Sequence, residues 1–181
     1  MRLEGVELRV VELPLVSPFR TSFGTELVKE CVILRAVTDE GEGWGECVAM
    51  ADPFYSSEFL SGAVEVLRRW LVPAVFAAGD EVTADRVLSL TEHVKEHRMA
   101  KAALEMAVLD AELRAAGVSL AERLGATETW VPSGVSVGIQ PSIAALVEVV
   151  DGYLAEGYRR IKLKIEPGFD VDAVRAVREH I

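Results

Sequence analysis

The alternation of apolar and polar residues near the N-terminus predicts a small antiparallel sheet. This pattern predicts a first strand from Leu3 to Leu15, followed by a loop over residues 16–25. Two further strands, Glu30–Thr38 and Trp44–Ala49, flank the acidic, glycine-containing turn Asp39–Gly43. We therefore expect these two strands to form a β-hairpin.

A helical periodicity replaces the alternation after the sheet. Ser56 or Ser57 is expected to cap the first helix, and Gly117 is typical of a helix end. The expected helices run from that cap to about Ala77, and then over Thr83–His97, Arg98–Ala116 and Ser119–Leu124. Residues 1–125 are therefore predicted to form an α+β domain.

From residue 126 onward the pattern changes to strands that alternate with helices. The expected elements are a strand over Val131–Ile139, a helix from Pro141 or Ser142 to Glu156, a strand over Tyr158–Ile165, and a helix from Asp170 to the end of the chain. This order is typical of a parallel sheet or a (β/α) barrel. Residues 126–181 are predicted to form two βα units, which cannot close a barrel by themselves.

A pair of lysines, Lys162 and Lys164, stands in the last predicted strand. Alternation along a strand places both ammonium groups on one face and Ile161 and Leu163 on the other. A solvated strand face is the simplest interpretation, but strands of βαβ units are usually covered on both faces. At the carboxyl end of a barrel strand, a lysine crowded by a second cation gives up its proton more easily. Such a lysine can act as a general base.

Charge and composition exclude several classes of partner. The net charge of −10 and the pI of 4.8 argue against nucleic acid and anionic membranes. The first residues carry charges where a signal peptide is apolar, and the longest apolar stretch, Trp70–Ala78, is too short to span a bilayer. A cytoplasmic location is therefore expected. Cys31 and Cys47 are expected to be reduced thiols, with a cross-strand disulfide as the alternative.

Three other features could carry chemistry. The segment His93–His97 matches the H-x-x-E-H pattern of some zinc peptidases, provided that both imidazoles lie on one helix face, although a solvated, charged helix end is the simpler interpretation. Ser136 lies in a predicted strand without the surroundings of a nucleophile, so it is interpreted as a packed hydroxyl. Two loops that flank the first sheet contain Phe19, Phe23, Met50 and Tyr55, which form either core or a substrate lid.

Five segments carry a family resemblance, in this order along the chain: Pro18–Thr25, Gly43–Cys47, Ala102–Asp110, Gly134–Ile139 and Ile161–Ile165. Together they resemble the o-succinylbenzoate synthase / N-succinylamino acid racemase branch of the enolase superfamily, and the resemblance covers the whole chain. It implies an α+β capping domain over residues 1–125. The first two βα units of a (β/α) barrel would then follow over residues 126–181.

The resemblance also implies a reaction and the residues that perform it. Enzymes of this superfamily remove a proton α to a carboxylate, and a divalent metal, usually Mg²⁺, stabilises the enediolate. Lys164 would be the acid/base catalyst, Lys162 would assist it and contact the substrate carboxylate, and Ser136 would help to bind the substrate. The capping-loop residues that the resemblance assigns to the substrate are Phe19, Arg20, Phe23, Met50 and Tyr55. The metal ligands of the family fall on later strands, so no residue here is assigned to the metal.

The implied activities are dehydration to o-succinylbenzoate, a step of menaquinone biosynthesis, and racemisation of N-acylamino acids, with a small carboxylate as the substrate. A muconate-cycloisomerase-like or dipeptide-epimerase activity stays open, as does a non-catalytic module that binds a ligand through its aromatic loops. Because the metal ligands are missing, residues 1–181 alone are expected to be inactive. Unpaired strand edges predict association or aggregation, with a homo-oligomer as one form of association.

Overall fold

The computed structural model describes all 181 residues, Met1 to Ile181, and they form two compact units. The first unit comprises residues 1–13 and 29–127, and the second comprises residues 14–28 and 128–181. Each unit has its own cluster of buried apolar side chains. The second unit is therefore assembled from two stretches of chain that lie far apart in the sequence.

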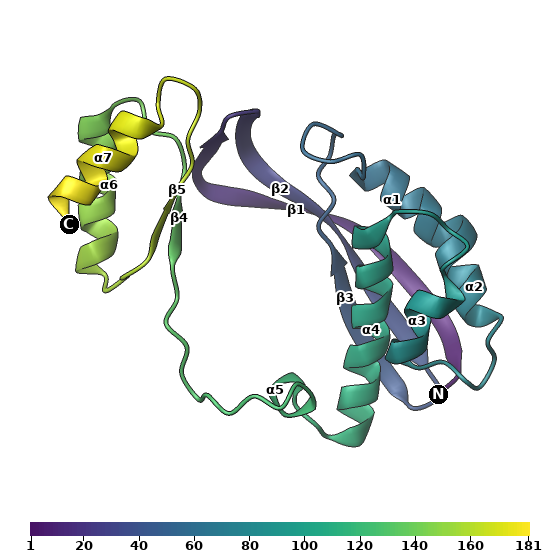
Figure 1. Ribbon diagram of the computed structural model, residues 1–181. Coiled ribbons are helices and arrows are strands. Elements are labelled where there is room, and N and C mark those ends of the chain that lie inside the picture. The colour runs from purple at the N-terminus through teal and green to yellow at the C-terminus, as the bar shows by residue number, and fades with distance from the viewer. The chain divides into compact units, whose positions relative to one another are not determined.

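A three-stranded sheet forms the frame of the first unit (Figure 1). Its strands are β1 (Leu3–Thr21), β2 (Gly24–Thr38) and β3 (Gly41–Cys47), in the order β1-β2-β3. Strands β2 and β3 pair antiparallel, with Thr38 opposite Gly41 and Val32 opposite Cys47. The predicted hairpin is thus confirmed, and the turn between its strands is only two residues long, at Asp39 and Glu40.

The loop predicted over residues 16–25 is wrong. Strand β1 continues to Thr21, and only Ser22 and Phe23 form the turn before β2 begins at Gly24. Pro14, near the end of the predicted first strand, does not interrupt β1. Proline is tolerated here because β1 is an edge strand, where the missing N–H need not enter a ladder.

Six helical segments complete the first unit: α1 (Leu60–Val66), a π-helical turn η1 (Leu67–Leu71), α2 (Val72–Phe76), α3 (Ala84–Leu90), α4 (Arg98–Ala116) and α5 (Leu120–Arg123). Helix α4 has the predicted bounds, and Gly117 ends it with a φ of 66°. The first helix begins later than predicted. Its N-cap is Phe59, because the Ser56 hydroxyl donates to the Glu58 carbonyl (2.9 Å) and caps no helix.

The helix predicted over Thr83–His97 is shorter in the structure. Thr83 is its N-cap, and α3 ends at Leu90. The Thr91 hydroxyl donates to the carbonyl of Val87 (2.7 Å), and turns follow. Glu96 and His97 then adopt left-handed backbone angles, with φ of 55° and 50°. Two such residues cannot continue a right-handed helix, so a break precedes α4.

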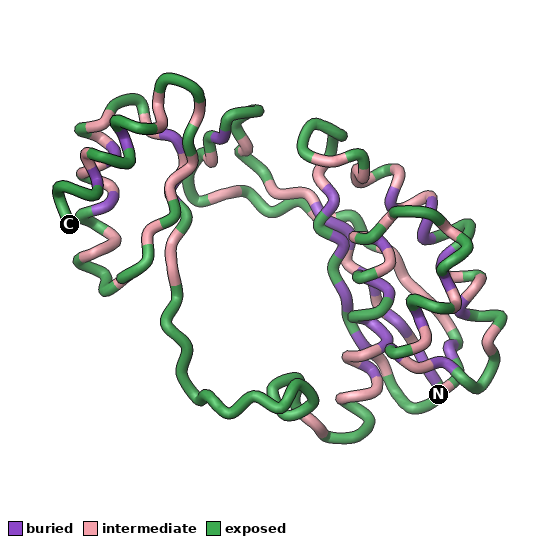
Figure 2. Tube along the Cα trace, in the orientation of Figure 1, coloured by how far each residue is buried: buried purple, intermediate pink, exposed green.

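Strand β3 and helix α4 pack backbone to backbone. A Cβ atom added at Gly45 would lie 2.1 Å from the Ala103 carbonyl oxygen, and one at Gly43 would lie 2.1 Å from the Ala111 nitrogen. The facing positions on α4 are alanines, so no large side chain keeps β3 and α4 apart. Buried residues concentrate at this contact (Figure 2). The glycines of β3 and the alanines of α4 therefore fix how the helix lies on the sheet.

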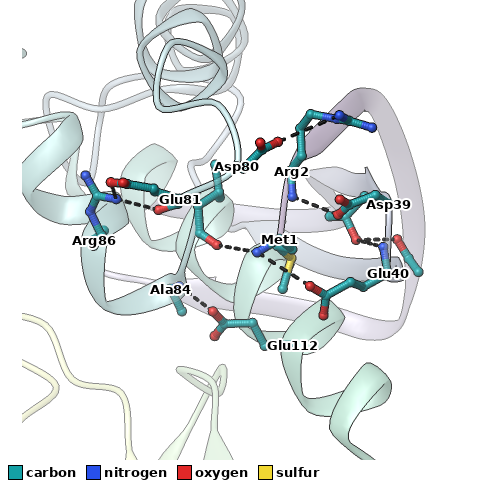
Figure 3. Close-up of polar contacts among 12 residues, drawn as sticks. Met1, Arg2, Asp39, Glu40, Asp80, Glu81, Ala84, Arg86 and Glu112 are labelled. Carbon is teal, nitrogen blue, oxygen red and sulfur yellow. Dashed lines mark hydrogen bonds and ion pairs between the residues drawn. The ribbon is translucent and has the colours of Figure 1, made fainter.

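Polar contacts tie the start of β1 to the rest of the first unit (Figure 3). The Met1 carbonyl accepts from the Val82 amide (3.1 Å), and the Met1 amino group donates to the Val82 carbonyl (3.4 Å). The amide of Arg2 donates to the Asp39 carboxylate (2.7 Å), while the Asp39 amide donates to the Arg2 carbonyl (3.1 Å). Both connections bring the backbone groups of the two residues before β1 into hydrogen bonds.

The second unit contains two βα repeats, β4 (Val135–Val137), α6 (Ile143–Ala155), β5 (Ile161–Leu163) and α7 (Val171–His180). Strands β4 and β5 pair in parallel, which confirms the predicted βαβα order. Both strands are shorter than predicted, since Val131 and Tyr158 lie outside them. The caps are as expected: Ser142 accepts from the Ala145 amide (3.2 Å), and Asp170 caps α7.

One face of the β4–β5 pair is covered by helices. Val137 of β4 is buried together with Leu146 and Val150 of α6 and Ala173 and Val177 of α7. The remaining apolar residues that pack on this cluster are Val135, Val149, Tyr153, Leu154, Ile161, Leu163 and Phe169. The confirmed fold is thus an α+β domain followed by two βα units.

None of the helices combines the length and the apolar composition that crossing a bilayer requires.

Candidate functional site

The face of the β4–β5 pair opposite the helices carries polar side chains. Ser136 of β4 and Lys162 of β5 are register partners, and both are exposed. Partners in a parallel ladder project to the same side of the sheet, so hydroxyl and ammonium share this face. Their sequence neighbours Val137 and Leu163 pack on the opposite face, against α6 and α7. The alternation predicted for this strand is therefore present.

Lys164 lies directly beyond the end of β5 and is half-buried. Its backbone amide donates to the carbonyl of Val137 (2.9 Å), which extends the parallel ladder by one further bond. Its ammonium nitrogen lies 5.5 Å from the centroid of the Phe19 ring. This distance is within the range of a cation–π contact. One side of the Lys164 ammonium group is therefore covered by an aromatic ring from the β1–β2 hairpin.

The tip of that hairpin contacts the ends of both parallel strands. The carbonyl of Arg20 accepts from the Ile139 amide (3.0 Å), beyond the end of β4. The Arg20 guanidinium donates from Nη2 to Oε1 of Glu166 (2.6 Å), beyond the end of β5. Phe23, in the turn of the hairpin, is 41% exposed. The tip of the β1–β2 hairpin and strand β5 thus both belong to the second compact unit.

Met50 and Tyr55 lie in the first unit, between β3 and α1. Met50 is half-buried, and its carbonyl accepts from the Leu60 amide (2.8 Å), so its backbone is fixed to the start of α1. The Tyr55 side chain is 67% exposed. Of the residues expected at the site, the structure brings together Ser136 with Lys162, and Phe19 with Lys164.

Two residues at the hairpin contact were not singled out in the sequence. Glu166 lies between the last predicted strand and the last predicted helix, and it is the ion-pair partner of Arg20. Gly138 approaches the hairpin so closely that an added Cβ would lie 3.2 Å from the Arg20 nitrogen and 3.3 Å from its oxygen. The sequence feature that could have pointed to Glu166 is its position at a strand end, directly before Pro167–Gly168. No pattern pointed to Arg20 as its partner.

Metal-ligating side chains do not gather anywhere in residues 1–181. No group of three or more His, Cys, Asp or Glu side chains is arranged to hold a metal ion. The carboxylate nearest the lysine strand in sequence, Glu166, is engaged by Arg20. The chain therefore offers no ligand set that fits a divalent metal, and we assign none of its residues to one.

The zinc-peptidase interpretation of His93–His97 is wrong. That pattern requires both imidazoles on one face of a helix. His93 lies in a turn after α3, and His97 occupies the left-handed N-cap position of α4, so no helix joins them. The segment is a strained connection between two helices.

The buried thiols Cys31 and Cys47 are free. Burial raises the pKa of the Cys47 thiol above its ordinary value. Burial, together with the nearby Glu46 carboxylate, does the same to the pKa of the Cys31 thiol. Both groups therefore stay protonated at neutral pH, and the alternative of a cross-strand disulfide is not realised.

Comparison with known proteins shows the family. Residues 5–125 match the family described as mandelate racemase / muconate lactonizing enzyme, N-terminal domain. An N-succinylamino acid racemase from Amycolatopsis sp. is 64% identical over 179 residues, which are 99% of this chain and 48% of the relative. An o-succinylbenzoate synthase from Geobacillus kaustophilus is 42% identical over 179 residues, again 48% of its length.

A solved structure agrees with these sequence relationships. An enolase-superfamily member from Listeria innocua superimposes with a TM-score of 0.91 at 36% identity, over 99% of this chain and 48% of the other. The chain thus spans about half the length of the relatives that it matches. It belongs to the mandelate racemase / muconate lactonizing enzyme family, in the enolase-superfamily branch of the o-succinylbenzoate synthases and N-succinylamino acid racemases.

Proposed function

We propose that this chain supplies the general base and the capping loops of an enzyme that removes a proton α to a carboxylate. The substrate would be an N-succinylamino acid, the o-succinylbenzoate precursor, or both. The observation that carries the proposal is the half-buried Lys164 under the Phe19 ring, beside the open face formed by Ser136 and Lys162. The 64% identity to an N-succinylamino acid racemase supports the same substrate class.

The proposed reaction begins at the Lys164 amine. Its neutral nitrogen forms a bond to the α-proton, and the electrons of the broken C–H bond move into the carboxylate to give an enediolate. Lys162 lies two residues away and contributes a positive charge beside the carboxylate, where negative charge accumulates. The hydroxyl of Ser136, opposite Lys162, can donate a hydrogen bond to the same substrate. In a dehydration, the protonated Lys164 would then assist the departure of hydroxide.

The capping loops would keep water away from the acidic carbon. Phe19 covers Lys164, and Phe23, Arg20, Met50 and Tyr55 are proposed to complete the lid over the substrate. Excluding water strengthens electrostatic interactions inside a site and prevents side reactions of the enediolate. Side chains of this kind also set which substituent of the α-carbon can be accommodated.

A divalent cation, Mg²⁺ in this superfamily, would neutralise the second charge of the enediolate when bound. No ligand set for such an ion is present in residues 1–181, so we propose that other residues of the enzyme hold it. It follows that residues 1–181 on their own should not turn over substrate. Turnover by this stretch alone that requires Mg²⁺ and disappears in Lys164→Ala would contradict this part of the proposal.

Exchange of the α-proton in D₂O tests the proposal directly. The full-length enzyme should incorporate deuterium into N-succinylamino acids, as read by NMR. Lys164→Ala should lower the rate by at least about 10²-fold, in line with the removal of a general base. Lys95→Ala serves as a control because Lys95 is an exposed lysine of the first unit. No exchange in the parent enzyme, or equal exchange in Lys164→Ala, would refute the assignment.

A further inference from the structure

The Arg20–Glu166 ion pair joins segments that lie farther apart in the sequence than those joined by the other ion pairs of β1 and β2. It joins residues 146 positions apart, whereas the Arg9–Glu7 pair on β1 joins neighbours two positions apart. The Glu166 side chain is 28% exposed, against 44% for Glu7. An ion pair that is partly removed from water and connects distant segments can fix their relative position, which a local pair on one strand cannot.

Glu166 is held in place independently of Arg20. Residues Glu166–Phe169 form a turn, in which the Phe169 amide donates to the Glu166 carbonyl (2.9 Å). Pro167 fixes the first central position, and Gly168 has a φ of 86° at the second, as a type II turn requires. The carboxylate is therefore presented at the carboxyl end of β5 by a rigid turn, two residues beyond Lys164.

Arg20 is the residue adjacent to Phe19, and it is held at two points. Its carbonyl accepts from the Ile139 amide (3.0 Å), and its guanidinium donates to Glu166 (2.6 Å). Gly138 allows this approach because a side chain there would press on the Arg20 backbone. The position of Arg20 thus determines where the Phe19 ring lies relative to the Lys164 ammonium.

We propose that Arg20 and Glu166 are positioning residues that latch the tip of the β1–β2 hairpin to the carboxyl end of β5, and so hold Phe19 over Lys164. The inference rests on the proposed function only for the role of Lys164 as the base. The latch opens when the ion pair separates, and the Ile139 amide then loses its acceptor. Opening of the tip uncovers Lys164, and closing covers it again.

Amide hydrogen exchange in the intact protein, resolved to single residues by mass spectrometry, tests the latch without any measurement of activity. Arg20→Met and Glu166→Gln should each speed exchange at the Ile139 amide about two- to fivefold, the range for a partly exposed ion pair. The Lys164 amide bonds within the β4–β5 ladder and should be unchanged. Arg9→Met is the control, because it breaks a local ion pair on the same strand and leaves Glu7 paired with Arg35.

Two further variants separate the latch from general stability. Arg20→Glu combined with Glu166→Arg restores an ion pair of reversed sign and should return the exchange at Ile139 toward the parent value. Gly138→Ala keeps both charged side chains, but its methyl group would lie 3.2 Å from the Arg20 nitrogen, so it should speed exchange at Ile139 alone. Unchanged exchange in Arg20→Met would overturn the proposal, as would equal acceleration at Ile139 and Lys164, which indicates loss of the whole unit.

A double-mutant cycle connects the latch to chemistry in the full-length enzyme. Arg20→Met should lower kcat about two- to fivefold in the parent but not in a Phe19→Leu background, because no ring remains to be positioned. Additive effects would assign Arg20 a separate role and contradict the positioning argument. If the parent enzyme exchanges no α-proton while Ile139 responds as expected, the proposed function fails and the latch stands.

Discussion

The Lys164 ammonium nitrogen lies 5.5 Å from the centroid of the Phe19 ring, although the two residues come from opposite ends of the chain. An aromatic face stabilises the positive charge that develops on the nitrogen as it takes the proton, and it also keeps water from that side of the nitrogen. We expect Phe19→Leu, which keeps an apolar side chain but removes the π face, to reduce kcat/KM of the full-length enzyme about two- to fivefold.

Steady-state kinetics on the Phe19→Leu and Phe19→Tyr variants check this expectation. Tyrosine retains the aromatic face, so Phe19→Tyr should keep most of the activity. Phe76→Leu changes a partly exposed phenylalanine on α2 and serves as the control. A loss of the same size in the tyrosine variant would show that the ring face is not what matters.

Gly45→Ala should disrupt the contact between β3 and α4. The new methyl group would lie 2.1 Å from the Ala103 carbonyl oxygen, a distance that only movement of the backbone can relieve. We expect the free energy of unfolding to fall by at least about 3 kcal/mol. Urea denaturation followed by circular dichroism measures the loss.

Gly5→Ala is the matched control for Gly45→Ala. It changes a glycine in the same sheet, where the nearest atom to an added Cβ is 4.0 Å away. Because alanine loses less conformational freedom than glycine on folding, this variant should be neutral or slightly stabilising. Equal destabilisation by both substitutions would mean that close packing on α4 is not the cause.

Glu58→Ala should weaken the start of α4. The two Glu58 carboxylate oxygens accept from the Met99 and Ala100 amides at 2.9 Å and 2.8 Å, and the N-cap residue His97 makes no cap with its own side chain. The carboxylate thus satisfies free amides at the positive end of the helix dipole. We expect a loss of about 1–2 kcal/mol in unfolding free energy.

The same urea titration can distinguish the cap from a general charge effect. Glu58→Gln keeps one acceptor and should lose less than the alanine variant. Glu92→Ala removes an exposed carboxylate of the same unit and should change little. An Ala variant as stable as the parent would exclude a contribution of Glu58 to the helix start.

The buried thiols should make the protein less stable in alkali. Burial raises the pKa of the Cys47 thiol above its value in the unfolded chain, which is about 8.5. Folding therefore favours the protonated thiol. Its contribution to the free energy of unfolding is complete below the pKa of the unfolded chain, and it is lost as the pH rises from that value to the pKa of the folded state. Urea unfolding at pH 7, 8, 9 and about 10 should show the decline.

The double variant Cys31→Ala/Cys47→Ala tests the origin of that decline. Without thiols, the unfolding free energy should depend less steeply on pH above about 8.5. Parallel curves for parent and variant would assign the alkaline loss to other groups.

Local sequence signals correctly predicted where two of the helices begin or end. Helix α4 ends at Gly117 and α7 begins after Asp170, as expected, because a left-handed glycine and an N-capping carboxylate act within one turn of chain. The helix expected through the H-x-x-E-H pattern is absent because no glycine or similar stop marks its end in the sequence. Periodicity through His93 continued, but the Thr91 side chain bonds back to the Val87 carbonyl and the helix ends.

Long-range contacts could not be predicted in the same way. The sequence indicated that Lys162 and Lys164 share a face, since this follows from alternation alone. It did not indicate that the first strand continues over residues 16–21 or that Arg20 pairs with Glu166. Those outcomes depend on which segment of the chain meets the ends of β4 and β5, and a single sequence contains no local signal for that.

The division of the second unit between residues 14–28 and 128–181 has a consequence for synthesis. A ribosome delivers the hairpin tip long before the strands that receive it, and contacts between such distant segments form slowly. The sheet and helices of the first unit can fold as soon as α4 has emerged. The hairpin tip can form its contacts only after β5 has been synthesised. Refolding should therefore show an early phase for Trp44 and Trp70 and a later one for protection of the Ile139 amide.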